Sequence, residues 1–292
     1  MTLRSRVRRA GGRVYRRVLR VSRTLAASVM RRGRQIVDPP DGERALRRRL
    51  TAAGASRSPR PPDRRWEGWV NTALQSEAQA DEAFATVQAA GLPPHGERPK
   101  NWDLLVALGL ILDRVPRSGS VLEMGATQYA RLLPWLFLYG YRSLRGIDLV
   151  YDGPVKAGPI RYDGMDMTRT TFPDASFEAI ASLSVVEHGV DLDAYLREAA
   201  RLLKPGGLLI TSTDYWCEPV DTGGKEAYGG PIRIFGPDDM RRFAHPAAAA
   251  AGFAPVRELD LGCAERAVEW KRFGLHYTFI NVVLEKGAAK GL

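Results

Sequence analysis

Cysteine, histidine and long apolar runs are scarce in this chain of 292 residues. It holds two cysteines and four histidines, and none of them forms a cluster with the spacing of a metal site. Cys217 and Cys263 are expected to be free or buried thiols in a reducing compartment. No apolar run reaches the roughly 18–20 residues that a membrane-spanning helix needs. Arginines also interrupt the early apolar residues, so no signal peptide is evident and a cytoplasmic location is expected.

Acidic residues and lysine are almost missing from residues 1–60. This segment has 18 arginines, no lysine and three acids, a net charge of +15, whereas the whole chain carries +10. The rest of the chain is therefore mildly acidic, at −5. The basic balance belongs to the N-terminal segment, which weakens the case for a protein built as a whole around nucleic acid.

The N-terminal segment has a helical pattern of its own. Apolar residues recur every three or four positions from Leu3 to Val29, with arginines on the remaining surface. Such an amphipathic segment is typical of an element that binds an anionic membrane surface, which would make the protein peripheral there. A transit peptide, nucleic-acid binding and a solvated tail are the alternatives. The next stretch, residues 36–65, is rich in proline, glycine and charge and is predicted to be a linker.

Beyond the linker, strand-like and helix-like segments alternate. Strands are predicted near residues 120–124, 144–148, 159–162, 177–183, 207–213, 255–262 and 275–285. Helices are predicted near residues 71–90, 100–115, 128–139, 191–203 and 237–251. The alternation predicts a doubly wound α/β fold with a mainly parallel sheet. The chain is thus divided into an N-terminal extension with its linker, a helical lead-in and a folded domain, at residues 1–65, 66–118 and 119–287.

Acidic residues stand at or just after the ends of the first three predicted strands. VLEMG carries Glu123 and Gly125, the next strand ends in Asp148, and Asp166 comes just after the third. This order builds a nucleotide-like ligand site at the carboxyl ends of parallel strands. A glycine lets the backbone approach a ligand closely, and an aspartate at the second strand can accept hydrogen bonds from both hydroxyls of a ribose.

Four segments in this order, VLEMG, GIDL, DMTRTTFPDASFEAIASLSVVEH and LREAARLLKPGGLLITSTD, resemble the class I S-adenosylmethionine-dependent methyltransferases. The resemblance is to the broad group that includes the ubiquinone and menaquinone biosynthesis methyltransferases. It implies a Rossmann-like, doubly wound, seven-stranded sheet whose last strand is antiparallel, and S-adenosylmethionine as the cofactor. The cofactor-binding residues that it implies are Glu123, Gly125, Ala126, Thr127, Asp148, Leu149, Asp166, Met167 and Leu183. Thr127 and Tyr129 stand where the fully glycine-rich turn would have two more glycines.

Two side chains near the ends of the fourth and fifth predicted strands could act as the base of the reaction. His188 titrates near neutral pH when unperturbed, and Asp214 follows the fifth strand, so either side chain could take a proton from a hydroxyl acceptor. The alternative for the Glu187–His188 pair is that it caps or orients the next helix. The long segment after the fifth strand is expected to cover the acceptor pocket. Polar and aromatic candidates for that pocket are Asp214, Tyr215, Trp216, Lys225 and Tyr228, with Lys100, Asn101 and Trp102 reaching in from the preceding helix.

The favoured function is methyl transfer from S-adenosylmethionine to a small-molecule or glycan acceptor, with oxygen as the favoured acceptor atom. A non-catalytic binding or scaffold protein on the same fold is the first alternative, motivated by Thr127 and Tyr129. A nucleic-acid methyltransferase that uses the arginine-rich arm is the second. The −5 charge of the rest of the chain and the absence of an Asn/Asp-Pro-Pro-Tyr motif count against it.

Overall fold

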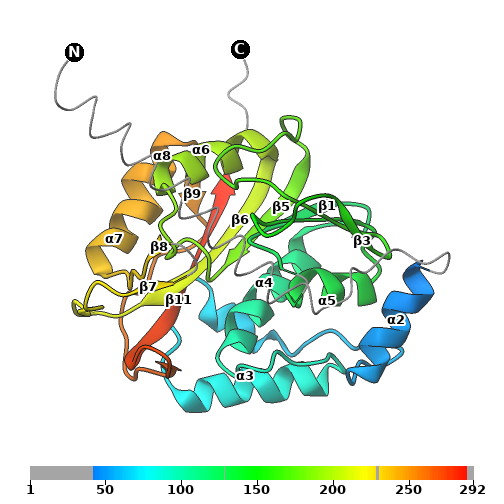
Figure 1. The fold of residues 1–292 in the computed structure, drawn as a ribbon, viewed down its shortest axis with the longest axis horizontal. Coiled ribbons are helices and arrows are strands. Elements are labelled where there is room, and N and C mark those ends of the chain that lie inside the picture. Colours follow the sequence, from blue (N-terminus) through cyan, green and yellow to red (C-terminus); the bar gives the residue numbers. More distant parts are fainter. Residues whose placement is uncertain (1–41, 128, 228–229, 288–292) are drawn as a thin grey trace.

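A computed structural model describes residues 42–127, 129–227 and 230–287, and its centre is a nine-stranded sheet (Figure 1). The strands of this sheet are β1 (Ser120–Met124), β2 (Ser143–Ile147), β3 (Val155–Ala157), β4 (Ile160–Asp163), β5 (Phe177–Leu183), β6 (Leu203–Tyr215), β9 (Phe253–Pro255), β10 (Val268–Trp270) and β11 (Leu275–Lys286). Their order is β10-β11-β6-β5-β1-β2-β4-β3, and β9 also pairs with β11. A separate hairpin joins β7 (Glu226–Ala227) to β8 (Gly230–Pro231).

The middle of the sheet has the predicted arrangement. Strands β4, β2, β1, β5 and β6 are parallel neighbours, and β11 runs antiparallel to β6. This order confirms the doubly wound, Rossmann-like fold with an antiparallel last strand. The sheet has nine strands rather than seven because β3 and β10 add short antiparallel strands, β3 beside β4 and β10 beside β11.

Helices cover the sheet from two sides. On one side lie α3 (Glu77–Ala89), α4 (Lys100–Arg114) and α5 (Leu132–Leu138), and on the other α6 (Leu192–Leu202), α7 (Pro237–Arg242), a π-helical turn (Phe243–Ala247) and α8 (Ala248–Ala250) (Figure 1). Two apolar clusters fill the spaces between the sheet and these helices. Trp102 and Trp135 are fully buried in the first cluster, and Tyr195 is fully buried in the second. The core thus fixes the sheet, and the carboxyl ends of its strands are left to build a site.

The predicted linker contains a helix, which corrects the expectation from its composition. Helix α2 (Gly42–Ala52) buries Leu46 and Leu50, which lie four residues apart on one face, against the main core, and a short 3-10 helix, η1 (Arg64–Trp69), follows. The predicted helix 71–90 is shorter than expected. It begins at Glu77, where the Ser76 hydroxyl accepts a hydrogen bond from the Gln79 amide at 3.1 Å.

The two cysteines are also not as predicted. Cys217 and Cys263, 46 residues apart in sequence, form a disulfide that links the segment after β6 to the segment after β9. The expectation of free thiols is therefore wrong, and with it falls the argument from the cysteines for a reducing compartment. No helix in the described residues is both long and apolar enough to cross a bilayer. The predicted amphipathic helix of residues 1–35 lies outside the described residues.

Candidate active site

The turn after β1 is closed tightly around Gly125. This residue has φ +79°, and a Cβ there would stand 2.3 Å from Cγ2 of Val185 in the loop after β5. The amides of Gly125 and Ala126 both donate hydrogen bonds to the carbonyl of Ile147, at 2.7 and 3.0 Å. The glycine is therefore required by the backbone conformation and by the approach of the next loop.

Glu123 lies at the base of this turn with one unsatisfied oxygen. The side chain is buried, and Oε2 has no hydrogen-bond partner in the part of the chain that the structure describes. Burial raises the pKa of this carboxyl to about 8. A buried polar atom without a partner is costly, so this oxygen marks a place where a ligand donor would be stabilised.

The ends of β2 and β4 carry the next acids. Asp148 is half-buried, and its Oδ1 accepts a hydrogen bond from the Val150 amide at 2.9 Å. Burial raises the pKa of the Asp148 carboxyl. Asp166 is exposed, and its Oδ1 accepts bonds from the amide and the hydroxyl of Thr168 at 2.9 and 2.7 Å. Both carboxylates thus stand at the carboxyl edge of the sheet with their orientation fixed.

The remaining predicted cofactor residues lie at the same edge. Met167 is buried in the second apolar cluster, Leu183 ends β5 half-buried, and Leu149 is half-buried after β2. Thr127 Oγ1 accepts a bond from the amide of Tyr129 at 3.3 Å, and the Tyr129 side chain is 65% exposed. The Thr127 hydroxyl thereby stabilises the turn at a position where glycine is typical. The Tyr129 side chain points into solvent and is not part of the core.

A pair of buried carboxyl groups lies at the ends of β5 and β6. Asp214 is the second-to-last residue of β6 and Glu187 stands in the loop after β5, and burial and the Asp214 charge raise the pKa of Glu187. Burial and the Asp214 charge also raise the pKa of the Tyr277 hydroxyl on β11, and the Thr213 hydroxyl donates a hydrogen bond to Glu187 Oε2 at 3.1 Å. Burial raises the pKa of Asp214 to about 7 and the pKa of Glu187 well above its ordinary value. At neutral pH the pair can hold a proton and can also take one.

The first turn of α4 supplies a cation to this pair. The Lys100 charge lowers the pKa values of Asp214 and Glu187 against the larger effect of burial, and Nζ lies 4.6 Å from the ring centroid of Phe279. Three residues along the same helix, Asp103 is buried and its Oδ2 accepts a bond from the Ser212 hydroxyl at 2.6 Å. The side chains of α4 therefore reach the ends of β6 and β11.

His188 is a weaker base than Asp214 in this setting. Burial and the Lys100 charge lower the pKa of the His188 imidazole to about 4. Its ring stands at a steep angle to the Trp270 ring, with the centroids 6.4 Å apart. The imidazole is consequently neutral near pH 7, where it accepts a proton less readily than the carboxyl pair.

Several residues predicted to line the acceptor pocket make contacts with other parts of the chain. The Tyr215 hydroxyl donates to the Leu261 carbonyl at 2.6 Å, and Lys225 donates to the Phe273 carbonyl at 2.8 Å. Trp216 is buried beneath the Arg266 guanidinium, 4.7 Å from the ring centroid.

On α4, Asn101 ties down the turn that precedes the helix, and Trp102 belongs to the core. Of the three predicted α4 residues, Lys100 alone acts on the carboxyl pair. Tyr228 lies outside the described residues.

Three residues of the site were not predicted. Asp103 lies three positions after Lys100, so helical spacing already indicated a shared face. The sequence predicts for Glu187 only a role with His188 in orienting the next helix. Tyr277 belongs to a strand pattern with no chemical signal, and only the pairing of β11 with β6 brings it to Asp214.

Residues 122–211 match the model of a family described as a methyltransferase domain. A ubiquinone biosynthesis O-methyltransferase from Methylobacterium nodulans is 34% identical over 55 residues, which are 19% of this chain and 22% of that protein. The chain thus matches only about a fifth of the length of this curated relative.

Solved structures with a similar fold include 1,6-didemethyltoxoflavin-N1-methyltransferase from Burkholderia thailandensis, crystallised with S-adenosylhomocysteine. It is 18% identical, with a TM-score of 0.48 over 72% of this chain and 87% of that chain. Geranyl diphosphate C-methyltransferase from Streptomyces coelicolor A3(2) is 15% identical, with a TM-score of 0.46 over 85% of this chain and 100% of that chain. Residues 122–211, which match the methyltransferase-domain family, thus span the doubly wound centre of the sheet from β1 to β6.

Proposed function

We propose that the protein transfers a methyl group from S-adenosylmethionine to a hydroxyl group of a small-molecule acceptor, a glycan among the candidates. The observation that carries this proposal is the buried Glu187–Asp214 pair at the ends of β5 and β6. A carboxyl group whose pKa is about 7 is suited to receive a proton at neutral pH. A hydroxyl acceptor, unlike an amine with a free electron pair, gains from such a base.

The residues at the ends of β1, β2 and β4 fit the cofactor. The unpartnered Glu123 Oε2 would receive a donor from the methionine part, and Asp148 would accept bonds from the ribose hydroxyls. Asp166 and Met167 would face the adenine, and the Gly125 turn would leave the backbone free to approach. S-adenosylmethionine supplies a methyl group that is already activated on a sulfonium, so the protein contributes alignment and exclusion of water.

The chain's own residues handle the proton. Asp214 accepts the acceptor's hydroxyl proton as the oxygen attacks, and burial beside Glu187 and Tyr277 tunes the pKa of the receiving carboxylate. The Lys100 charge favours the ionised form of the pair before the proton arrives. His188, with a pKa near 4, stays neutral at pH 7 and is not the base.

Calorimetric titration with S-adenosylmethionine tests the cofactor assignment. Asp148→Ala should weaken binding by roughly 10- to 100-fold, the loss expected for hydrogen bonds to a charged group. Asp152→Ala removes an exposed carboxylate four residues away and should leave the affinity unchanged. Equal affinity in the wild type and Asp148→Ala would contradict the assignment, and no binding to the wild type would favour a non-catalytic binding protein.

The acceptor is found by screening hydroxyl-bearing compounds, sugars included, for transfer of a radiolabelled methyl group. Methylation of hydroxyl oxygen is the expected result, read from the product by mass spectrometry and its fragmentation. Transfer only to nitrogen or carbon acceptors would contradict the role given to the carboxyl pair while leaving the cofactor assignment intact.

A further inference from the structure

One face of the sheet at β2, β4 and β3 is not covered by a helix from its own connections. The chain passes from β2 to β5 through β3 and β4 alone, with no helix between them. Helix α5 packs on β2 and β4, and α2 packs on β3. Parallel sheets are normally covered on both faces, so an open face here calls for a reason.

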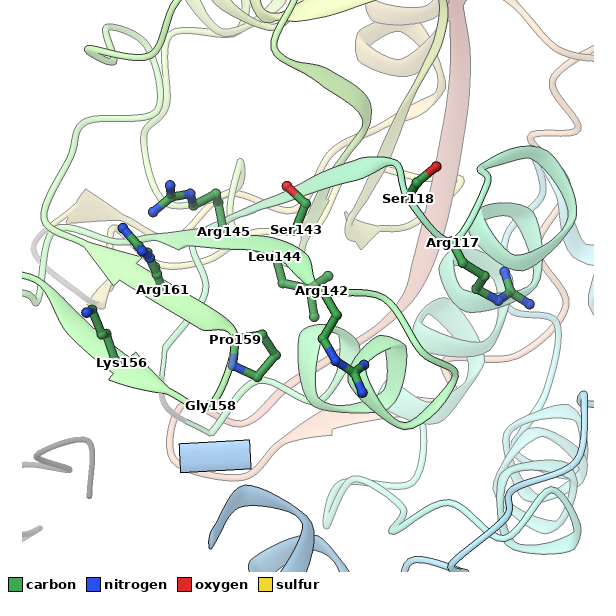
Figure 2. Close-up of a pocket in the computed structure, with 10 residues that line it drawn as sticks. All are labelled: Arg117, Ser118, Arg142, Ser143, Leu144, Arg145, Lys156, Gly158, Pro159 and Arg161. Carbon is green, nitrogen blue, oxygen red and sulfur yellow. The ribbon is translucent and has the colours of Figure 1, made fainter. Parts of the chain in front are cut away.

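Three cations stand side by side on that face. In the strand register, Arg145 of β2 is paired with Arg161 of β4, and Arg161 is paired with Lys156 of β3. Figure 2 shows these three side chains on adjacent strands, directed to the same side. Their neighbours along β4, Ile160 and Tyr162, are buried, as the alternation of a strand requires.

The charges of this row are not compensated. Like charges directly opposite one another destabilise a sheet, yet none of the three cations forms an ion pair with any residue that the structure describes. Neighbouring Arg142, by contrast, pairs with Glu43 at 3.0 Å. An anion bound to this row would therefore offset the repulsion among its charges.

A hollow of about 500 Å³ adjoins the row at the amino ends of the strands (Figure 2). Arg117 and Arg142 also line it, and both are held in place. The Arg117 guanidinium donates to the Tyr141 hydroxyl at 2.6 Å, and the Arg142 guanidinium lies 4.8 Å from the Phe137 ring centroid. This end of the strands is opposite to the edge that carries Asp148, so the hollow is separate from the candidate active site.

The N-terminal part of the chain joins the fold beside this hollow. Gly158, which lines the hollow, lies against the start of α2 at Gly42 and Glu43. On α2, Arg44, Arg48 and Arg49 are exposed. The 41 residues before α2 hold 12 arginines against two acids, with apolar residues at helical spacing.

We propose that this basic face, defined by Arg145, Arg161 and Lys156 with the adjoining hollow, docks on an anionic phospholipid bilayer and takes phosphate headgroups. Cations near such a surface are attracted individually, and a second signal from an amphipathic basic segment makes the attachment stable. The residues that line the hollow include no aromatic side chain, whereas surfaces for single-stranded nucleic acid stack bases on aromatic rings. The hollow lies at the amino ends of the strands, opposite to the carboxyl edge, so docking there leaves the candidate active site uncovered.

Vesicle co-sedimentation of the full chain tests the proposal. The wild type should bind vesicles of phosphatidylcholine with about one third phosphatidylglycerol and not pure phosphatidylcholine. For the triple variant Arg145→Gln, Arg161→Gln, Lys156→Gln, the concentration of these anionic vesicles at half-binding should rise by roughly tenfold or more. Its urea midpoint should equal or exceed that of the wild type, because the like charges are gone.

A matched variant, Arg197→Gln with Lys271→Gln and Arg272→Gln, removes the same charge from exposed positions elsewhere and should bind within about twofold of the wild type. Equal weakening of both triple variants would overturn the proposal, as would vesicle binding that the first triple leaves unchanged. Two further probes, inorganic pyrophosphate and single-stranded RNA, identify other ligands. Loss of binding to either one in the first triple, with vesicle binding intact, would also overturn it.

Discussion

The carboxyl edge of the sheet has two halves whose acids differ in solvent exposure and in their affinity for a proton. At the ends of β2 and β4, Asp148 and Asp166 keep contact with solvent and accept hydrogen bonds from nearby amides. At the ends of β5 and β6, Glu187 and Asp214 are only 1% and 3% exposed, and burial and the Asp214 charge raise the pKa of Glu187. The first half offers acceptors for a ligand's hydroxyl and amino groups. The second half can store and receive a proton, which an exposed aspartate does poorly at neutral pH.

The two halves differ in the burial of their acids because different elements of the chain lie over them. The second half lies under the start of α4 and beside β11, which bring Lys100 and Tyr277 to the pair. The first half lies where β2 leads into β3 without a helix, so less of the chain covers its acids. The connection from β4 to β5 has no helix either, which leaves the basic face of these strands uncovered.

Removing the proton acceptor should have the largest effect. Asp214→Asn keeps the shape of the side chain but cannot take the proton, so methyl transfer should fall by roughly 100-fold or more. The affinity for S-adenosylmethionine should stay within about twofold, because the variant leaves the first half intact. The assay is radiolabelled methyl transfer beside calorimetry. A parallel loss of cofactor binding would show that the two halves are not separate.

Breaking the disulfide should act on stability. Cys217 and Cys263 are 46 positions apart in sequence, and for a loop of that length chain entropy suggests about 4 kcal/mol or less of stabilisation. The double variant Cys217→Ser with Cys263→Ser should lose up to that much free energy of unfolding, read from urea denaturation. It should still bind S-adenosylmethionine. Thiol titration of the unreduced wild type checks the bond itself. One or two free thiols per chain in that titration would contradict the pairing.

The turn of the first half should be intolerant of a side chain. Gly125→Ala places a methyl group against Val185 at a positive φ, which should cost about 1–3 kcal/mol of unfolding free energy. Gly153→Ala is the matched control, because a Cβ there meets nothing within 4 Å. Urea denaturation measures both variants. Equal stability of the two would mean that the turn is looser than the contact with Val185 indicates.

Removing the Lys100 charge should have the mildest effect, a shift in the pKa of Asp214. The Lys100 charge holds the pKa of Asp214 down, so Lys100→Met should move that pKa upward, by roughly one unit. The ionised form then persists only at higher pH. Carbon-13 NMR of the carboxyl groups, assigned by comparison with Asp214→Asn, follows the titration. Lys100→Arg should titrate like the wild type, and an unchanged or lowered pKa in Lys100→Met would contradict the role of the charge.

The first half was largely predictable from the sequence, and the second half was not. Asp148 and Glu123 stand at the ends of apolar runs bounded by turns, so a local pattern placed them at one edge of the sheet. Tyr277 and the disulfide depend on pairings across many residues, which no local pattern contains. Helix α2 was missed because two leucines among arginines fold as a helix only when the core receives them.

A crystal structure with bound S-adenosylhomocysteine tests the central claim most directly. Its ribose hydroxyls should lie within hydrogen-bond distance of Asp148, with the sulfur facing the Glu187–Asp214 pair across the end of β5. A ligand bound away from Asp148, or one whose sulfur points away from the carboxyl pair, would contradict the division of the edge into a cofactor half and a proton-transfer half.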